Sequence, residues 1–144
     1  MSVREDIAKN IITTLKAVKS PISIKLVTRE PFDFDKLSNQ QFPAVLIRSA
    51  AESRNDNSVG GSLSTRMASV DFELVCFVKA KQIDTARNNI IEAVEEGLDS
   101  DRTRGGHALN TEITTISIDE GQIQPIGGVI ITVNINYIFT RGST

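Results

Sequence analysis

The chain has 144 residues, of which 16 are basic and 18 acidic, and its net charge at pH 7 is −2. A slightly acidic chain carries no bulk charge that calls for nucleic acid or an anionic membrane, which argues against a dedicated DNA-binding protein. The single cysteine, Cys76, excludes a disulfide framework and a thiolate metal cluster within one chain. No stretch approaches the roughly 18 apolar residues of a membrane-spanning helix. We therefore expect a soluble, unprocessed, intracellular chain that forms one domain over residues 1–144.

The first predicted element is a helix that begins at about Val3 and ends before Pro21. Ser2 and Glu5 have the spacing of a capping box, in which each side chain satisfies a backbone donor at the helix start. Apolar residues then recur on one face of the helix: Val3, Ile7, Ile11, Leu15 and Val18.

A short strand is predicted next at residues 22–28, where apolar and polar side chains alternate until Pro31. Residues 30–42 lack strand periodicity, and we expect a packed loop with a helical turn there. After Pro43 a strand is predicted at 44–51. Residues 53–65 hold adjacent glycines and almost nothing to bury, so we expect a long loop that is disordered in the free subunit and becomes ordered against a partner.

The clearest pattern in the chain is a strand followed by a helix. From Ala68 to Val78 every second residue is apolar, which is typical of a half-buried strand. Val75 and Phe77 make the far end apolar on both faces, so we expect that end to be covered twice or to lie against a neighbouring subunit. Asp84 is the expected N-cap of a helix at 84–98 with an apolar stripe.

The remaining sequence predicts a polar connection and two strands. Residues 99–111 form a long polar loop, and a strand with Ile113, Ile116 and Ile118 ends near Gly121. The last strand, at 129–140, is longer than a small domain needs, so its end is expected to reach a partner. The order of elements predicts an α+β fold, in which a mostly antiparallel sheet of about five strands carries the N-terminal helix and the helix at 84–98.

No catalytic constellation is visible in the sequence. His107 is the only histidine, and it lies in a loop near Asp99 and Asp101, but it lacks a second strong ligand and a nucleophile. Cys76 sits on the inward face of a strand and is interpreted as a small buried apolar residue. We predict no enzyme, no metal and no cofactor. The alternative from another class is a ligand-binding or enzymatic α+β domain that uses the loop at 99–107.

Charged residues at strand ends and in loops are the candidates for contact with a protein partner. Their mixed signs suit an interface between subunits, where complementary charges fix register. The simpler interpretation of each is an ordinary solvated loop charge. No aromatic residues are interleaved with them to stack on nucleic-acid bases. The candidates are Arg48, Arg54, Asp56, Arg66, Asp101, Arg102, Arg104 and Arg141.

Three segments carry a family resemblance: PFDFDKLSNQQFPAVLIRSAAE at 31–52, LDSDRTRGGHALNTEITTISIDEG at 98–121 and YIFTRG at 137–142. They resemble the tail-terminator and neck, or head-tail joining, proteins of tailed bacteriophages, and the resemblance covers the whole order of elements. It implies a small α+β virion subunit that forms a ring, usually hexameric, on the head-proximal end of the tail tube. Such a ring stops tube polymerisation and presents the surface to which the head is joined.

The resemblance also implies the partners and the location. The partners are other copies of the chain, the tail tube protein, head-tail connector proteins and, in tails that have one, the sheath. DNA passes through the lumen without sequence-specific binding, and no membrane is involved. The ring is assembled in the host cytoplasm and is retained in the virion. Another head-tail connector or tail-completion protein is the alternative within the same structural class.

Overall fold

The computed structural model describes residues 3–19, 22–30, 37–56, 65–118 and 126–140. Two helices and five strands are joined in the order α1 (Val3–Ala17), β1 (Leu26–Thr28), the 3-10 helix η2 (Asn39–Gln41), β2 (Ala44–Asp56), β3 (Thr65–Lys79), α2 (Ile83–Asp99), β4 (Asn110–Ile118) and β5 (Ile126–Thr140). Among the described residues, no helix is long and apolar enough to cross a membrane.

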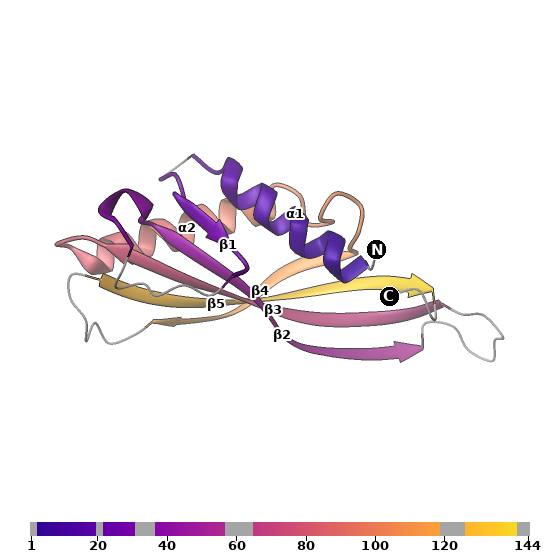
Figure 1. The fold of residues 1–144 in the computed structure, drawn as a ribbon. Coiled ribbons are helices and arrows are strands. Elements are labelled where there is room, and N and C mark those ends of the chain that lie inside the picture. The colour runs from indigo at the N-terminus through magenta and orange to yellow at the C-terminus, as the bar shows by residue number, and fades with distance from the viewer. Residues whose placement is uncertain (1–2, 20–21, 31–36, 57–64, 119–125, 141–144) are drawn as a thin grey trace.

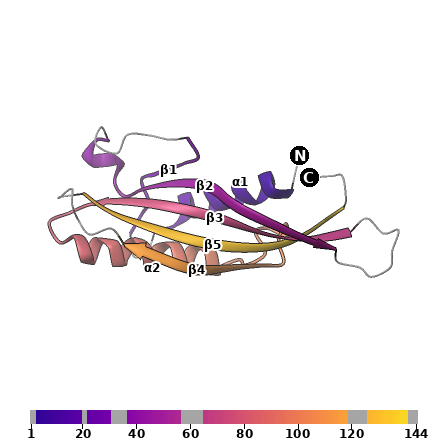
Figure 2. The ribbon, with the colours of Figure 1, turned by 90° about the horizontal axis from the view of Figure 1, so that it is seen from below.

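The strands form one twisted sheet in the order β1-β2-β3-β5-β4. Only β1 and β2 run parallel, and the other neighbouring pairs are antiparallel. The neighbouring inner strands β3 and β5 pair over fifteen residues, from Thr65 opposite Thr140 to Lys79 opposite Ile126, and they form the long axis of the molecule (Figure 2). The predicted α+β class with a mostly antiparallel sheet is confirmed.

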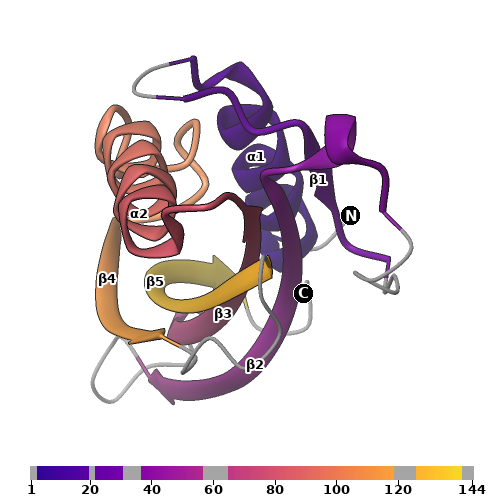
Figure 3. The ribbon, with the colours of Figure 1, turned by 90° about the vertical axis from the view of Figure 1, so that its left-hand side faces the viewer.

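Both helices lie on the same face of the sheet (Figures 1 and 3). That face, called here the helix face, receives the buried side chains of β3, from Ala68 to Val78 at every second position, and those of β5 from Val129 to Tyr137. The helices contribute Ile7, Ile11, Ile90 and other buried apolar residues to the same core. Burying one such side chain contributes roughly 1.5–3 kcal/mol, so the predicted alternation is what orients the sheet.

The predicted loop at 53–65 is wrong at both ends. Residues 53–56 belong to β2, whose backbone pairs with β3 as far as Asp56 opposite Arg66, and Thr65 already belongs to β3. Pairing with a neighbouring strand stabilises this stretch although its composition offers little to bury. A β-bulge between Ser49 and Glu52 shifts the register of the β2–β3 pair. The predicted disorder of residues 57–64 lies outside the described residues.

Several predicted boundaries also shift. The first strand is confined to Leu26–Thr28, because only these residues pair with β2. Helix α2 begins at Ile83 after the N-cap Gln82, so Asp84 lies in the first turn rather than at the cap. In the first turn its negative charge interacts favourably with the helix dipole. Asp99 ends α2 and Asn110 starts β4, which shortens the loop predicted at 99–111 to residues 100–109. Ser2, Pro21, Pro31 and Gly121, the predicted cap and stops, lie outside the described residues.

Candidate interaction surface

The sheet face opposite the helices, called here the outer face, carries a band of paired polar side chains. Arg48 Nε donates to Glu73 Oε1 at 2.7 Å, and these residues are direct cross-strand partners. Asn134 Nδ2 donates to Ser69 Oγ at 2.7 Å and to Asp71 Oδ1 at 2.8 Å. An exposed pair such as Arg48 and Glu73 contributes about 1 kcal/mol or less to folding. The band therefore fixes a pattern of charge on the outer face more than it stabilises the chain.

Apolar side chains flank this polar band on the outer face. Leu46, Val75 and Ile130 lie side by side in register across β2, β3 and β5, and all three are half-buried. Toward the opposite end, Met67 and Ile138 are cross-strand partners that are 36% and 38% exposed. Along the strands the outer face thus changes from apolar to polar and back to apolar. Both helices lie on the other side of the sheet (Figure 3).

The helix face ends in a cluster around the carboxylate of Glu52. Tyr137 donates its hydroxyl to Glu52 Oε1 at 2.7 Å. Arg54 Nε and Arg4 Nη1 donate to Glu52 Oε2 at 2.5 Å and 3.3 Å. Burial opposes ionisation, but these hydrogen bonds and arginine charges outweigh it, so the pKa of Glu52 lies below its ordinary value. The cluster joins the first turn of α1 to β2 and β5.

A turn after α2 holds a buried arginine. Arg104 is 0% exposed, and its Nη2 donates to the carbonyl oxygen of Leu98 at 2.5 Å and to that of Asp101. Burial lowers the pKa of Arg104, and the charges of Asp101 and Asp99 offset part of that effect. The guanidinium bonds carbonyls at the C-terminus of α2, a position that favours a cation. Predicting Arg104 as a surface contact was therefore wrong, because the fold encloses its side chain.

The carboxylate of Asp101 is used by the same turn. It accepts hydrogen bonds from Thr103 N, from Thr103 Oγ1 at 2.6 Å and from Gly105 N at 2.8 Å. The bond from the Thr103 side chain and the backbone bonds lower the pKa of Asp101 to about 2. His107 Nδ1 lies 4.0 Å from Asp6 Oδ2. Within the described ranges no three His, Cys, Asp or Glu residues are grouped to hold a metal ion.

The other predicted contact residues do not meet in one place. Arg48 is on the outer face, whereas Arg54 bonds Glu52 at the edge of the helix face. Asp56 and Arg66 are backbone partners at the end of the β2–β3 pair. Arg102 Nε donates to the carbonyl of Thr111 at 3.3 Å, and Arg141 lies outside the described residues.

Sequence reasoning missed the partners that organise these charges. Glu52, Glu73, Asn134 and Tyr137 were not among the candidates, although they bond to Arg54, Arg48, Asp71 and Glu52 respectively. The sequence could have identified Glu73 as an outward-facing side chain, because Glu73 occupies one of the polar positions that alternate with apolar ones in the strand at 68–78. For Asn134 and Tyr137 the alternation of apolar and polar residues predicts which face of the sheet each side chain is on. Only the register of the paired strands identifies the residue to which each one bonds.

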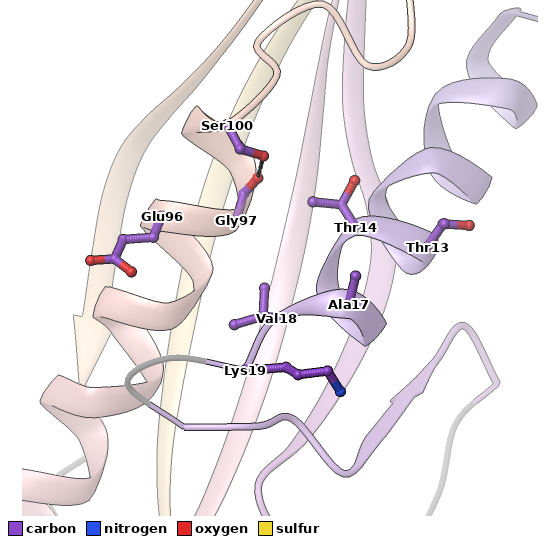
Figure 4. A pocket seen from close by; sticks show the side chains of 8 residues that line it. All are labelled: Thr13, Thr14, Ala17, Val18, Lys19, Glu96, Gly97 and Ser100. Carbon is purple, nitrogen blue, oxygen red and sulfur yellow. Dashed lines mark hydrogen bonds between the residues drawn. The ribbon is translucent and has the colours of Figure 1, made fainter.

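A cavity of about 470 Å³ lies between the C-terminal halves of α1 and α2 (Figure 4). Small or hydroxyl-bearing residues line much of it, including Thr13, Thr14 and Ser100, whose Oγ donates to the Gly97 carbonyl at 2.7 Å. A Cβ atom on Gly97 would lie 2.7 Å from Val18 Cγ2. Val18 can therefore pack against α2 at this point because Gly97 has no side chain.

No protein-family model matches the chain, and no curated protein matches it.

Proposed function

We propose that this protein is the ring-forming structural subunit that caps the head-proximal end of a bacteriophage tail tube. The observation that carries the proposal is the outer face, where half-buried Leu46, Val75 and Ile130, and exposed Met67 and Ile138, flank the polar band on the side away from both helices. Exposed apolar side chains next to polar ones are characteristic of protein interfaces.

In the proposed assembly the outer face of one subunit packs on a different surface of the next. Such head-to-tail contacts generate a closed ring when the rotation between subunits closes, and we take six as the number of subunits from the family resemblance. The apolar ends supply the association free energy, and Arg48, Glu73 and Asp71 set the register between subunits.

The ring stops tube growth by covering the last layer of tube subunits and offering no surface for another layer. Its opposite side receives the connector proteins of the head, and the sheath joins the same end in contractile tails. DNA passes through the lumen of the ring. Because the chain has a net charge of −2, it does not bind the DNA phosphates strongly. Another connector or tail-completion protein of this structural class would use the same outer face for a different neighbour.

The test combines light scattering and negative-stain electron microscopy of the purified protein with an assembly reaction of tail tube protein. We expect rings with a central opening and tubes that stop growing when the protein is added. Val75→Asp places a charge in the apolar part of the outer face and should abolish rings and capping while the circular dichroism spectrum is retained. Asn88→Asp, on the exposed side of α2, is the matched control and should behave as wild type.

Two results would contradict the proposal. One is a strictly monomeric protein, in the presence of tube protein, that leaves tube length unaltered. The other is a folded Val75→Asp variant that forms rings and caps tubes as the wild type does.

A further inference from the structure

A surface cavity of about 500 Å³ opens beside the first half of α2, bounded by the segment after α1, the start of β2 and the end of β3. Lys19, Lys25 and Lys79 line it, and its ten described lining residues include no carboxylate. The whole chain has a net charge of −2, so this cavity is a positive site on an acidic protein. We call it the lysine pocket.

The floor of the lysine pocket is apolar. Phe42 and Val78 line it and are 8% and 3% exposed, and the half-buried side chains of Ile22 and Ala86 extend it. Lys79 Nζ lies 5.9 Å from the centroid of the Phe42 ring, a distance at which an ammonium is attracted by the face of the ring. One positive charge is thereby held directly beside the apolar floor.

Backbone hydrogen bonds hold the walls of the pocket together. The N–H groups of Lys25 and Leu26 both donate to the carbonyl of Pro43, at 2.9 Å and 3.4 Å. The segment that carries Ile22 and Lys25 is therefore fixed against the start of β2. A preformed site loses less entropy on binding than one that must be assembled by the ligand.

We propose that the lysine pocket binds a peptide segment of a protein partner in which carboxylates flank an apolar side chain. The apolar side chain would pack on Phe42 and Val78, and the carboxylates would pair with Lys19 and Lys25, beside the positive charge of Lys79. The combination of an apolar centre and a charged rim is that of a protein interface. A DNA backbone would pair with the lysines but leave the apolar floor without a partner. The volume falls within the roughly 300–1,000 Å³ of typical binding pockets.

This inference goes beyond the proposed ring and does not depend on it, because the residues that line the lysine pocket are not those that form the apolar parts and the polar band of the outer face. The test therefore uses the purified full-length chain without tail components. The probe is an acetylated, fluorescein-labelled peptide of alternating Glu and Phe residues, followed by fluorescence anisotropy. The comparison peptide carries Gln in place of every Glu.

The double variant Lys25→Glu/Lys79→Glu should weaken binding of the probe by about tenfold or more, a loss of about 1.4 kcal/mol or more. The control Lys9→Glu/Lys16→Glu changes the net charge equally at exposed positions of α1 outside the pocket and should bind nearly as the wild type does. Ala86→Leu, which fills part of the floor without altering charge, should also weaken binding. The Gln peptide should bind more weakly than the Glu peptide.

Several outcomes would overturn the proposal. These are a probe that does not bind, equal losses in the two double variants, or Glu and Gln peptides of equal affinity. Duplex DNA that displaces the peptide and binds more tightly would identify a phosphate site instead. Self-association lost only in the Lys25→Glu/Lys79→Glu variant would show that a second copy of the chain occupies the pocket.

Discussion

Tyr137 and Glu52, which lie 85 positions apart in the sequence, are joined by a hydrogen bond of 2.7 Å between the tyrosine hydroxyl and Glu52 Oε1. Tyr137 is 0% exposed, and burial, together with the neighbouring Glu52, raises its pKa to about 12. The hydroxyl therefore stays protonated and donates across the ordinary pH range. Because Glu52 also accepts from Arg4 of α1, this bond is part of the link between the helix and the sheet.

Tyr137→Phe should lower the free energy of unfolding by about 1–2 kcal/mol, since it removes a hydrogen bond to a charged acceptor. Arg4 and Arg54 still bond the carboxylate, which limits the loss. Urea denaturation followed by circular dichroism measures the change. Thr13→Val is the control, because it removes an exposed hydroxyl that donates to the Lys9 carbonyl within α1. A Tyr137→Phe variant as stable as the control would contradict the role given to this bond.

Glu52 should make stability depend on pH in a definite direction. Its pKa is lower in the folded state than the ordinary value of 4.5, so the folded state binds this proton less readily than the unfolded state does. The resulting stabilisation is fully present above the ordinary pKa and is lost as the pH falls through the folded pKa.

Glu52→Gln should accordingly be destabilised relative to wild type at neutral pH, with the difference shrinking as the pH is lowered below the ordinary pKa. Denaturation curves of both proteins across this range measure it. A difference between them that does not change with pH would show that the charge of Glu52 contributes nothing to stability.

How far the sequence predicts this fold depends on which interactions are periodic. The alternation from Val70 to Val78 identifies the buried side of β3 correctly, because a strand has only two faces and one of them is packed. The extension of β2 through residues 53–56 is not predictable in this way. It arises from backbone pairing with β3, which leaves no mark on composition.

The candidate surface was less predictable than the fold for the same reason. Arginines at loop positions are usually exposed, and nothing near Arg104 except the glycines at 105 and 106 hints at the tight turn that buries it. The pairing of Tyr137 with Glu52 requires knowledge of the strand order, and the approach of Val18 to Gly97 requires knowledge of the helix packing. Local patterns contain neither.

Gly97→Ala should lower the free energy of unfolding by about 1–3 kcal/mol through overpacking. The new Cβ would lie 2.7 Å from Val18 Cγ2, well inside the roughly 3.5–4.0 Å of favourable carbon contacts. The better helix propensity of alanine, about 1 kcal/mol, opposes this loss without cancelling it. Thermal unfolding measures the net effect.

The double variant Gly97→Ala/Val18→Ala separates the clash from the change in helix propensity. Removing the Val18 methyl groups should make Gly97→Ala less costly than it is in the wild-type background, with a coupling of about 1 kcal/mol. Stabilisation by Gly97→Ala alone, or strictly additive effects, would show that the two residues do not constrain each other.

Arg104→Ala should lower the free energy of unfolding by about 2–4 kcal/mol, whereas Arg48→Ala should lower it by about 1 kcal/mol or less. The first removes a buried side chain together with the donors to the Leu98 and Asp101 carbonyls. The second removes an exposed partner of Glu73. Both replacements delete one arginine charge, so urea denaturation of the two proteins isolates the effect of position. Equal losses would mean that Arg104 does not secure the end of α2.

Cys76 should be chemically inert in the folded protein. Its side chain is 0% exposed on the helix face of β3, and burial raises the pKa of the thiol to about 12. Because the thiolate is the species that reacts with disulfide reagents, both access and ionisation oppose modification. A disulfide reagent at neutral pH should leave the native protein unlabelled and modify one thiol per chain after unfolding in guanidinium chloride.

The rate at which Cys76 is labelled should follow the rate at which the structure opens, so Tyr137→Phe and Gly97→Ala should label faster than wild type if opening is global. Rapid labelling of the native wild type would place Cys76 at the surface and contradict the packing of β3 against the helices.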